Sequence, residues 1–273
     1  MRLDRALVAR GLVTSRTRAQ ELIAAGAVTL DGAPVSKASL DVDDDARLEV
    51  VGDDGYVSRA AHKLIGALQS CPELAVEGRV CLDVGASTGG FTQVLLERGA
   101  ARVHAIDVGH DQLAAAVAAD PRVRAREGLN ARELVPADLE GDAPDLVVAD
   151  VSFISLTLLV GPIVGVLAEH ADVLLMVKPQ FEVGRERLGR GGVVTDVDDR
   201  ARAVLSVASA MMGAGLDVHR IARSTLPGPH GNVEFFVWAS RSWQAGDGDR
   251  RRPVALTEAQ VRAAIAQETG GAP

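Results

Sequence analysis

The sequence predicts an α/β protein in which a doubly wound, mostly parallel sheet follows a small α+β unit. From residue 58 onward, short apolar runs alternate with segments of helical spacing, which is typical of parallel strands covered by helices on both faces. A glycine-rich turn, "DVGASTGGFT", joins the first of these runs to a helix. Residues 1–51 carry helix and hairpin signals of their own and end at the glycine-rich stretch "GDDG". We therefore expect two folded units.

Two short helices are expected to begin the chain. The run "DRALVARGL" predicts a helix that ends at Gly11. Ser15 is placed to cap a second helix, "RTRAQELIAAG", with Leu22 and Ile23 facing inward and Gly26 as its stop.

A hairpin is expected next, because two apolar runs flank Asp31–Gly32, and the strand "RLEVV" completes the unit. The acidic residues before that strand lack EF-hand spacing, so we expect a solvated turn and no metal; they are Asp41, Asp43, Asp44 and Asp45. These signals define a first domain over residues 1–51 and a linker over 52–57.

The N-terminal unit is basic although the chain as a whole carries a net charge of −8. Nucleic-acid binding depends mainly on Lys and Arg side chains that neutralise phosphates. The local excess of arginine therefore matters more than the net charge of the whole chain. We expect RNA to bind here through Arg2, Arg5, Arg10, Arg16 and Arg18. A solvated basic helix with no partner is the alternative.

The second unit is expected over residues 58–242, with a tail over 243–273. Ser58 should cap a helix whose buried stripe includes Leu64, Ile65 and Leu68 and leaves Lys63 near its edge. Thr257 should cap a short helix in the tail. The predicted strands are "RVCLDVG", "RVHAIDVG", "VRAREG", "PDLVVADVS", "DVLLMVKPQ", "DVHRIARST" and "NVEFFVWAS".

Cysteine content and targeting signals favour a cytoplasmic protein. Cys71 and Cys81 lie in or beside apolar runs with no metal-ligand spacing, and the N-terminus lacks a secretory signal. The uncharged stretch 151–168 is just long enough for a membrane span, but Gly161–Pro162 interrupts it. A buried strand end followed by a core helix explains the same composition, and we expect no membrane partner.

The glycine turn predicts a site for an adenosine-containing cofactor. Ligands of open α/β sheets sit beyond the carboxyl ends of the strands, and Asp107, about twenty residues after the turn, can accept hydrogen bonds from ribose hydroxyls. The glycine spacing departs from the dinucleotide fingerprint, and Asp83 suits an ammonium better than a phosphate. We therefore favour S-adenosylmethionine, with a nicotinamide dinucleotide as the alternative. The residues expected at the cofactor are Asp83, Gly85, Ala86, Ser87, Thr88, Gly89, Gly90, Asp107, Leu129, Asn130 and Asp150.

Polar residues at strand ends predict the reacting groups. Asp150 closes "LVVAD", Lys178 closes "VLLMVK" and Glu234 lies in "NVEFFVW", all at the expected cofactor edge. A lysine with a neighbouring cation can serve as a general base toward a hydroxyl. We assign that role to Lys178, with Lys63 as the neighbouring cation and the carboxylates orienting the amines. Anchoring of loops is the alternative for each residue.

The chain resembles the TlyA (hemolysin A) family of ribosomal RNA 2′-O-methyltransferases, which are related to the FtsJ methyltransferases. The motifs that carry this resemblance are "AHKL", "LDVGASTGGFT", "ADVSFISL", "VKPQFEVG" and "GNVEFF", together with "ARGLVTSRTRAQELIAAGAVTLDG" in the N-terminal unit. The resemblance implies a Rossmann-like methyltransferase with a seven-stranded sheet, a ribosomal-protein-type RNA-binding domain, and methylation of a cytidine ribose in ribosomal RNA of one or both subunits. It also implies a catalytic tetrad of Lys63, Asp150, Lys178 and Glu234.

The loop "FEVGRERLGRGGVV" is expected to contact RNA phosphates beside the site, with a loop that has no such role as the alternative. Its arginines are Arg185, Arg187 and Arg190, and we add Arg59 to the expected RNA-binding set. Competing functions are a pore-forming haemolysin, based on the uncharged stretch, a non-catalytic RNA-binding or ribosome-assembly factor, and a nicotinamide oxidoreductase.

Overall fold

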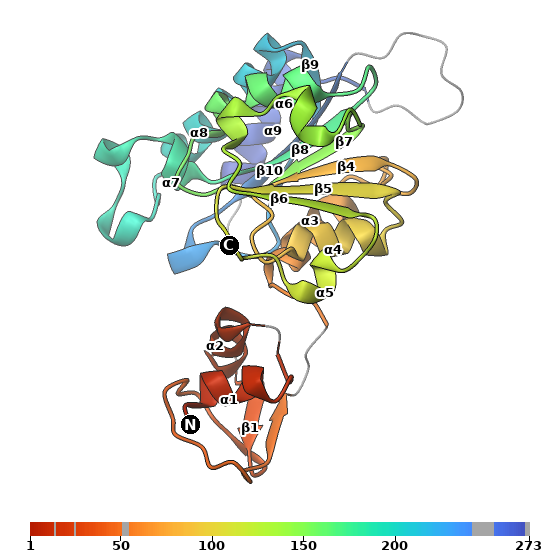
Figure 1. Cartoon of the computed structure of the whole chain (residues 1–273). Coiled ribbons are helices and arrows are strands. Elements are labelled where there is room, and N and C mark those ends of the chain that lie inside the picture. Colours follow the sequence, from red (N-terminus) through yellow and green to blue (C-terminus); the bar gives the residue numbers. More distant parts are fainter. Residues whose placement is uncertain (14, 25, 51–54, 242–253, 271–273) are drawn as a thin grey trace.

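The computed structural model describes residues 1–13, 15–24, 26–50, 55–241 and 254–270 as two separate bodies (Figure 1). The smaller body holds the N-terminal fifty residues, and the larger one holds the rest. Each has its own cluster of buried apolar side chains. The predicted division into two folded units matches this arrangement.

The N-terminal body is a small α+β unit built from the predicted elements. Its helices and strands are α1 (Leu3–Ala9), α2 (Arg16–Ala24), β1 (Val28–Leu30), β2 (Ala33–Pro34) and β3 (Leu48–Val50). The Ser15 hydroxyl accepts a hydrogen bond from the Arg18 amide at 3.1 Å, as expected of a helix cap. Asp31 and Gly32 have φ of +50° and +82°, which a two-residue hairpin turn requires. Local sequence signals therefore predicted this body well.

A buried carboxylate organises part of the predicted basic patch. Asp4 is fully buried and accepts hydrogen bonds from Arg2 at 3.0 Å and Arg16 at 3.1 Å. The hydrogen bond from Arg2 holds the pKa of this carboxyl well below its usual range. Arg10 instead donates to backbone carbonyls of the acidic turn, at 2.8 Å for Asp43.

One arginine departs from the expected patch. Arg18 is only 8% exposed, because its side chain points into the body, so it does not belong to an exposed surface as the sequence led us to expect. Arg5 is exposed, and the side chains of Arg2 and Arg16 remain 42% and 50% exposed beside Asp4.

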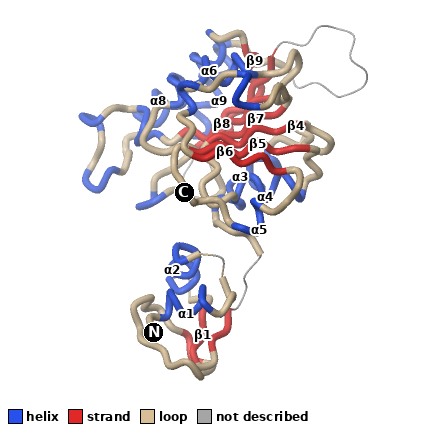
Figure 2. Tube along the Cα trace, viewed as in Figure 1, coloured by secondary structure: helices blue, strands red, loops and turns tan. Residues whose placement is uncertain are grey.

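The larger body is built on a seven-stranded sheet with the order β6-β5-β4-β7-β8-β10-β9 (Figure 2). Neighbouring strands pair in parallel from β6 to β8, whereas β10 runs antiparallel to both β8 and β9. The strands are β4 (Val80–Val84), β5 (Arg102–Asp107), β6 (Val123–Glu127), β7 (Leu146–Ala149), β8 (Asp172–Val177), β9 (Leu216–Arg223) and β10 (Phe235–Arg241). All the predicted strands are present, and the fold is the expected doubly wound one.

Helices cover both faces of this sheet (Figure 1). Buried side chains of α3, α4 and α5 form one core cluster with one face, and those of α6, α8 and α9 form another with the opposite face. The helices are α3 (Ala60–Ser70), α4 (Gly90–Glu97), α5 (Ala115–Ala118), α6 (Val160–Val166), α7 (Pro179–Glu182), α8 (Val197–Gly213) and α9 (Glu258–Gly270). Because both faces are buried, the central strands are mostly apolar, with Asp83 in β4 and Asp172 at the start of β8 as buried exceptions.

The C-terminal helix belongs to the larger body and is not a separate tail. Thr257 caps α9, as predicted: its hydroxyl accepts from the Gln260 amide at 3.3 Å while the Gln260 side chain accepts from the Thr257 amide at 2.9 Å. Val261 and Ile265 are buried in the same cluster as α6 and α8. Residues 242–253, which include most of the stretch between β10 and this helix, lie outside the described residues.

The uncharged stretch 151–168 becomes a loop, a 3₁₀ turn and the seven-residue helix α6. Val160, Ile163 and Val166 of α6 are buried in the core, which confirms the core-helix interpretation. Within the described ranges, no helix has the length and apolar character needed to cross a bilayer.

Candidate active site

The glycine turn brings β4 into α4 at the carboxyl edge of the sheet. Gly85 has φ of +82° and Gly89 has φ of +96°, which only glycine adopts easily. A Cβ on Gly85 would lie 2.9 Å from the carbonyl oxygen of Asp150, and one on Gly89 would lie 2.8 Å from Leu113. The turn therefore needs glycine for backbone conformation and for close approach, as the sequence predicted.

Asp107 ends β5 and holds the turn from the side. Its Oδ2 accepts a hydrogen bond from the Ser87 amide at 2.9 Å, and its Oδ1 accepts one from the Gly109 amide at 2.7 Å. A carboxylate has about four acceptor sites, so two remain for a ligand. Asp107 is half-buried, and it lies where a ribose could be recognised.

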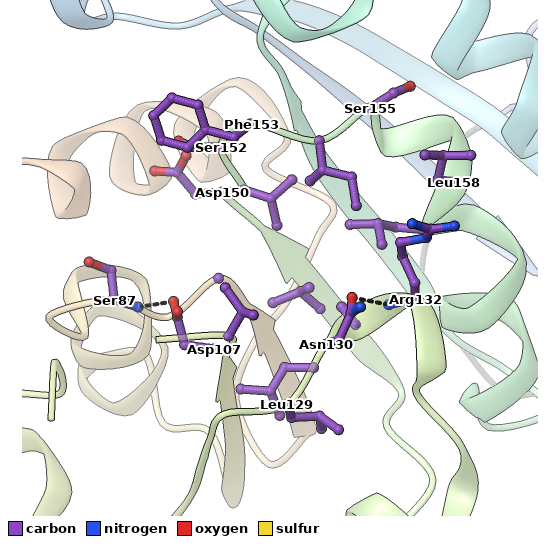
Figure 3. Close-up of a pocket in the computed structure, with 18 of the residues that line it drawn as sticks. Ser87, Asp107, Leu129, Asn130, Arg132, Asp150, Ser152, Phe153, Ser155 and Leu158 are labelled. Carbon is purple, nitrogen blue, oxygen red and sulfur yellow. Dashed lines mark hydrogen bonds between the residues drawn. The ribbon is translucent and has the colours of Figure 1, made fainter. Parts of the chain in front are cut away.

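A cavity of about 820 Å³ opens beside this turn (Figure 3). Ser87 and Asp107 line one side of it, and Leu129 and Asn130 line the floor below them. The stretch from Asp150 to Leu159 forms the opposite wall, and Val108, Gln112 and Arg132 also contribute.

A second, smaller cavity of about 160 Å³ continues from the first toward the helix α3. The two share Gly85, Ser87, Asp150 and Ser152. The smaller cavity is lined in addition by Ser58, Ala60, Ala86, Thr88, Gly90, Phe91 and Lys178. Of the predicted turn residues, all but Gly89 line one or both cavities, and Lys178 lines the smaller one.

Asp83 does not lie in either cavity, in contrast to the prediction. It is fully buried beneath the turn, where its Oδ2 accepts a hydrogen bond from the Thr92 hydroxyl at 2.7 Å. Burial raises the pKa of this carboxyl to about 7, although the hydrogen bond from Thr92 opposes the change. Asp83 lies inside β4, and its side chain is covered by α4, which carries Thr92.

The predicted base is paired with a carboxylate. The Nζ of Lys178 lies 2.6 Å from Oδ1 of Asp150 and donates a hydrogen bond to Oγ of Ser152 at 2.9 Å. The Lys178 side chain is 9% exposed and that of Asp150 is 15% exposed, so the pair is nearly buried but reaches the smaller cavity.

A second lysine–carboxylate pair lies beside the first. The Nζ of Lys63, on α3, donates to Oε2 of Glu234 at 2.5 Å, and both residues are almost completely buried. Glu234 immediately precedes β10, and Phe235 faces Val177 in the antiparallel β8–β10 register. One residue further along the same register, Glu234 faces Lys178. The reversed direction of β10 is what brings its first residues to this edge.

The structure therefore brings the four predicted tetrad residues together beside the glycine turn. Each lysine has a carboxylate as its ion-pair partner, Glu234 for Lys63 and Asp150 for Lys178. Lys63 is itself buried, at 5% exposure.

Three residues of the site were missed by sequence reasoning. Ser152 contacts Lys178, and Glu182 contacts the cavity wall. Phe153 is 91% exposed, has φ of +65°, and lies with its ring centroid 5.2 Å from that of Phe181. All three lie within the motifs "ADVSFISL" and "VKPQFEVG", so the resemblance in these motifs could have indicated them as site residues.

The arginines expected to contact RNA have different environments. Arg59 and Arg185 are exposed, whereas Arg187 forms an ion pair with Asp199 at 3.1 Å and is half exposed. The side chain of Arg190 lies outside the described part of the chain. No cluster of potential metal ligands occurs among the residues that the structure describes.

Comparison with protein families finds two matches that together span most of the chain. The model of the FtsJ-like methyltransferases matches residues 56–241, the whole of the seven-stranded body up to β10. The model of the S4 domain matches residues 1–48, which make up the N-terminal body.

Individual relatives are similar over nearly the same length. The chain is 52% identical over 239 residues to the 16S/23S rRNA (cytidine-2′-O)-methyltransferase TlyA of Mycobacterium tuberculosis, covering 87% of this chain and 88% of that protein. It is 37% identical over 237 residues to hemolysin A of Brachyspira hyodysenteriae, covering 87% and 98%. The solved structure of a candidate hemolysin from Streptococcus thermophilus superposes with a TM-score of 0.76 at 33% identity, covering 99% and 96%.

Proposed function

Because the chain belongs to the FtsJ-like methyltransferase family, we propose that it methylates the 2′-hydroxyl of a cytidine in ribosomal RNA, with S-adenosylmethionine as methyl donor and Lys178 as general base. The observation that carries this proposal is the meeting of two lysine–carboxylate pairs beside a cofactor-sized cavity. The cytidine-2′-O activity named for the M. tuberculosis relative supports it.

The cavity residues fit S-adenosylmethionine, although Asp83, part of the sequence argument against a dinucleotide, does not line either cavity. Asp107 retains acceptor sites for ribose hydroxyls, and Asn130 and Leu129 line the region where an adenine would lie. The smaller cavity, against the glycine turn and the start of α3, would hold the methionine end. Bound there, the cofactor would supply an electrophilic methyl group to an oxygen nucleophile.

Lys178 is the residue placed to activate that nucleophile. A hydroxyl attacks well only when its proton is withdrawn, and the amine lies at the end of the cavity that continues from the cofactor site. In the proposed step, the Lys178 amine, having released a proton to solvent, accepts the proton of the 2′-hydroxyl. Asp150 and Ser152 hold the amine in place, and Lys63 with Glu234 supports this arrangement from the neighbouring strand. Holding the groups in line supplies much of the acceleration.

The N-terminal body is proposed to bind ribosomal RNA. It matches the S4 domain and exposes arginines although the whole chain is acidic. Arg5, Arg2 and Arg16 are accessible for phosphate contacts. RNA-binding proteins often stack unpaired bases on aromatic side chains. Phe153 is exposed beside the cavity and is therefore suited to stack on the target base.

The proposal is tested by mapping ribose methyls on ribosomal subunits incubated with the purified protein and S-adenosylmethionine. We expect methylation at a cytidine, no transfer by Lys178→Ala, and cofactor binding by that variant within about threefold of wild type, since the lysine touches only the end of the cavity. Methyl transfer by Lys178→Ala at the wild-type rate would exclude Lys178 as the base. Absence of ribose methylation by the wild type would exclude the function itself.

A further inference from the structure

The short helix α7 and the lysine before it contact the cavity wall at three points. Lys178, just before α7, donates to Ser152, and the ring of Phe181 lies against that of Phe153. Glu182, the last residue of α7, contacts Ser155. The contacts follow the same order along both segments, so the wall and the segment carrying the lysine lie side by side.

Glu182 makes two hydrogen bonds to the wall at the end away from the lysine. Its Oε2 accepts a hydrogen bond from the Ser155 hydroxyl at 2.5 Å, and its Oε1 accepts one from the Leu156 amide at 2.8 Å. Burial raises the pKa of Glu182, while these two hydrogen bonds oppose that rise.

The wall that Glu182 holds is also a wall of the cofactor cavity. Ser152, Phe153, Ile154, Ser155 and Leu158 all line it (Figure 3). The Ser155 hydroxyl in turn accepts from the Thr157 amide at 3.2 Å and caps the 3₁₀ turn that continues the wall. Glu182 thus fixes both the side chain and the backbone at the point where the loop enters that turn.

We propose that Glu182 is a positioning residue that couples the cofactor-cavity wall to Lys178. It touches neither the cavity nor the reacting atoms in this arrangement and acts through Ser155 and Leu156. With Lys178 holding one end of the wall and Glu182 the other, displacement of the wall moves the amine, and ordering of the wall by a ligand orders the amine. The inference rests on the proposed function for its assignment of Lys178 as the base.

The experiment compares Glu182→Ala, Glu182→Asp and Glu182→Gln with wild type and with the exposed neighbour Glu186→Ala as control. Three quantities are measured in the full-length protein: hydrogen exchange of residues 151–159 without ligand, the Kd for S-adenosylmethionine, and the single-turnover methylation rate at saturating cofactor. Glu182→Gln keeps the length and can still accept from the Leu156 amide and donate to the Ser155 hydroxyl. Glu182→Asp keeps the charge but is one methylene too short.

We expect Glu182→Ala and Glu182→Asp to exchange the Leu156 amide faster, to weaken cofactor binding about tenfold, and to lower the saturated rate about 100-fold. Glu182→Gln and Glu186→Ala should stay within about threefold of wild type in all three measurements. A residue that only stabilised the fold would lower the midpoint of unfolding and leave the saturated rate unchanged.

The coupling is refuted if Glu182→Ala binds the cofactor and transfers methyl groups at saturation like wild type, or if Glu182→Gln is as impaired as Glu182→Ala. Should Glu182→Ala fail to fold, Ser155→Ala removes the other partner of the same hydrogen bond and is expected to show the same pattern more weakly; wild-type values there would also refute it. Hydrogen exchange needs neither cofactor nor RNA. If the wild-type protein methylates no ribose, the proposed function is refuted. Hydrogen exchange of residues 151–159 then still tests whether Glu182 holds the cavity wall.

Discussion

Replacing Asp83 with asparagine should stabilise the larger body at alkaline pH and remove part of its pH dependence. Burial raises the pKa of the Asp83 carboxyl from 3.8 to about 7, against the opposing hydrogen bond from Thr92. The folded protein therefore keeps a proton that the unfolded chain has already released between these two values. The stability that this proton contributes is fully present below about pH 4 and is lost as the pH rises to about 7.

The size of the effect follows from the width of that window. A rise of about 3 pKa units corresponds to about 4 kcal/mol, and the carboxyl is fully buried, so solvent screening does not reduce it. Between about pH 5 and about pH 8 only the upper part of the window is crossed, which leaves about 2.5 kcal/mol. Asparagine does not titrate there and still offers an oxygen to the Thr92 hydroxyl. Any cost of burying its amide hydrogens is the same at both pH values and cancels.

The assay is urea unfolding followed by tryptophan fluorescence at about pH 5 and about pH 8. Trp238 is buried in β10, so its fluorescence reports the larger body, and neither tryptophan of the sequence lies within residues 1–50. The free energy of unfolding of Asp83→Asn, relative to wild type, should rise by about 2.5 kcal/mol from the lower to the higher pH. Asp44→Asn, an exposed change in the N-terminal body, should leave this signal unaltered. A relative free energy that is equal at both pH values, or that falls, would refute the reasoning.

Further changes probe the ion pairs, the turn and the RNA surface. Glu234→Ala leaves the buried Lys63 ammonium unpaired and should lower the free energy of unfolding, measured with urea, by about 3–5 kcal/mol. Adding Lys63→Met to that variant should recover much of this loss. If it recovers nothing, the ion pair is not the cause. Gly85→Ala would place a Cβ at φ of +82° and 2.9 Å from the Asp150 carbonyl oxygen. It should lower the free energy of unfolding by about 1–3 kcal/mol and weaken cofactor binding measured by calorimetry. Gly161→Ala, whose Cβ would meet open space, should change neither quantity. Phe153→Ala removes a side chain that is 91% exposed. The free energy of unfolding should change by less than about 0.5 kcal/mol and cofactor affinity should persist, whereas ribose methylation should fall. Full methylation activity would argue against base stacking on Phe153. Arg185→Ala should reduce the salt slope of ribosomal RNA binding by about 1, while Glu186→Ala should not; equal slopes would remove Arg185 from the RNA surface.

The local signals in the sequence were sufficient for most of the fold. Ser15 and Thr257 cap helices where predicted, and Asp31 with Gly32 turns the hairpin. These features depend on residues within a few positions of one another, so the pattern contains all the information needed. The alternation of apolar strands with helices extended the same reasoning to the doubly wound sheet.

Contacts between distant segments could not be read in this way. Lys63 and Glu234 are 171 positions apart, and only the antiparallel placement of β10 beside β8 brings them together. The same holds for Glu182, which meets Ser155 across 27 positions. The resemblance indicated the four tetrad residues, but which lysine pairs with which carboxylate depended on the packing of α3 and the order of the strands.

Burial decided the residues for which the sequence was misleading. Asp83 and Asp107 both occur near strand ends, yet Asp83 is buried inside β4, where Thr92 of α4 donates to it, whereas Asp107 is the last residue of β5 and lines the cavity. Arg5 in α1 and Arg18 in α2 could not be told apart from the sequence, but Arg18 is buried and Arg5 is exposed. Composition and spacing determined the fold class and the kind of site, whereas the direction of each polar side chain was settled only when distant segments packed around it.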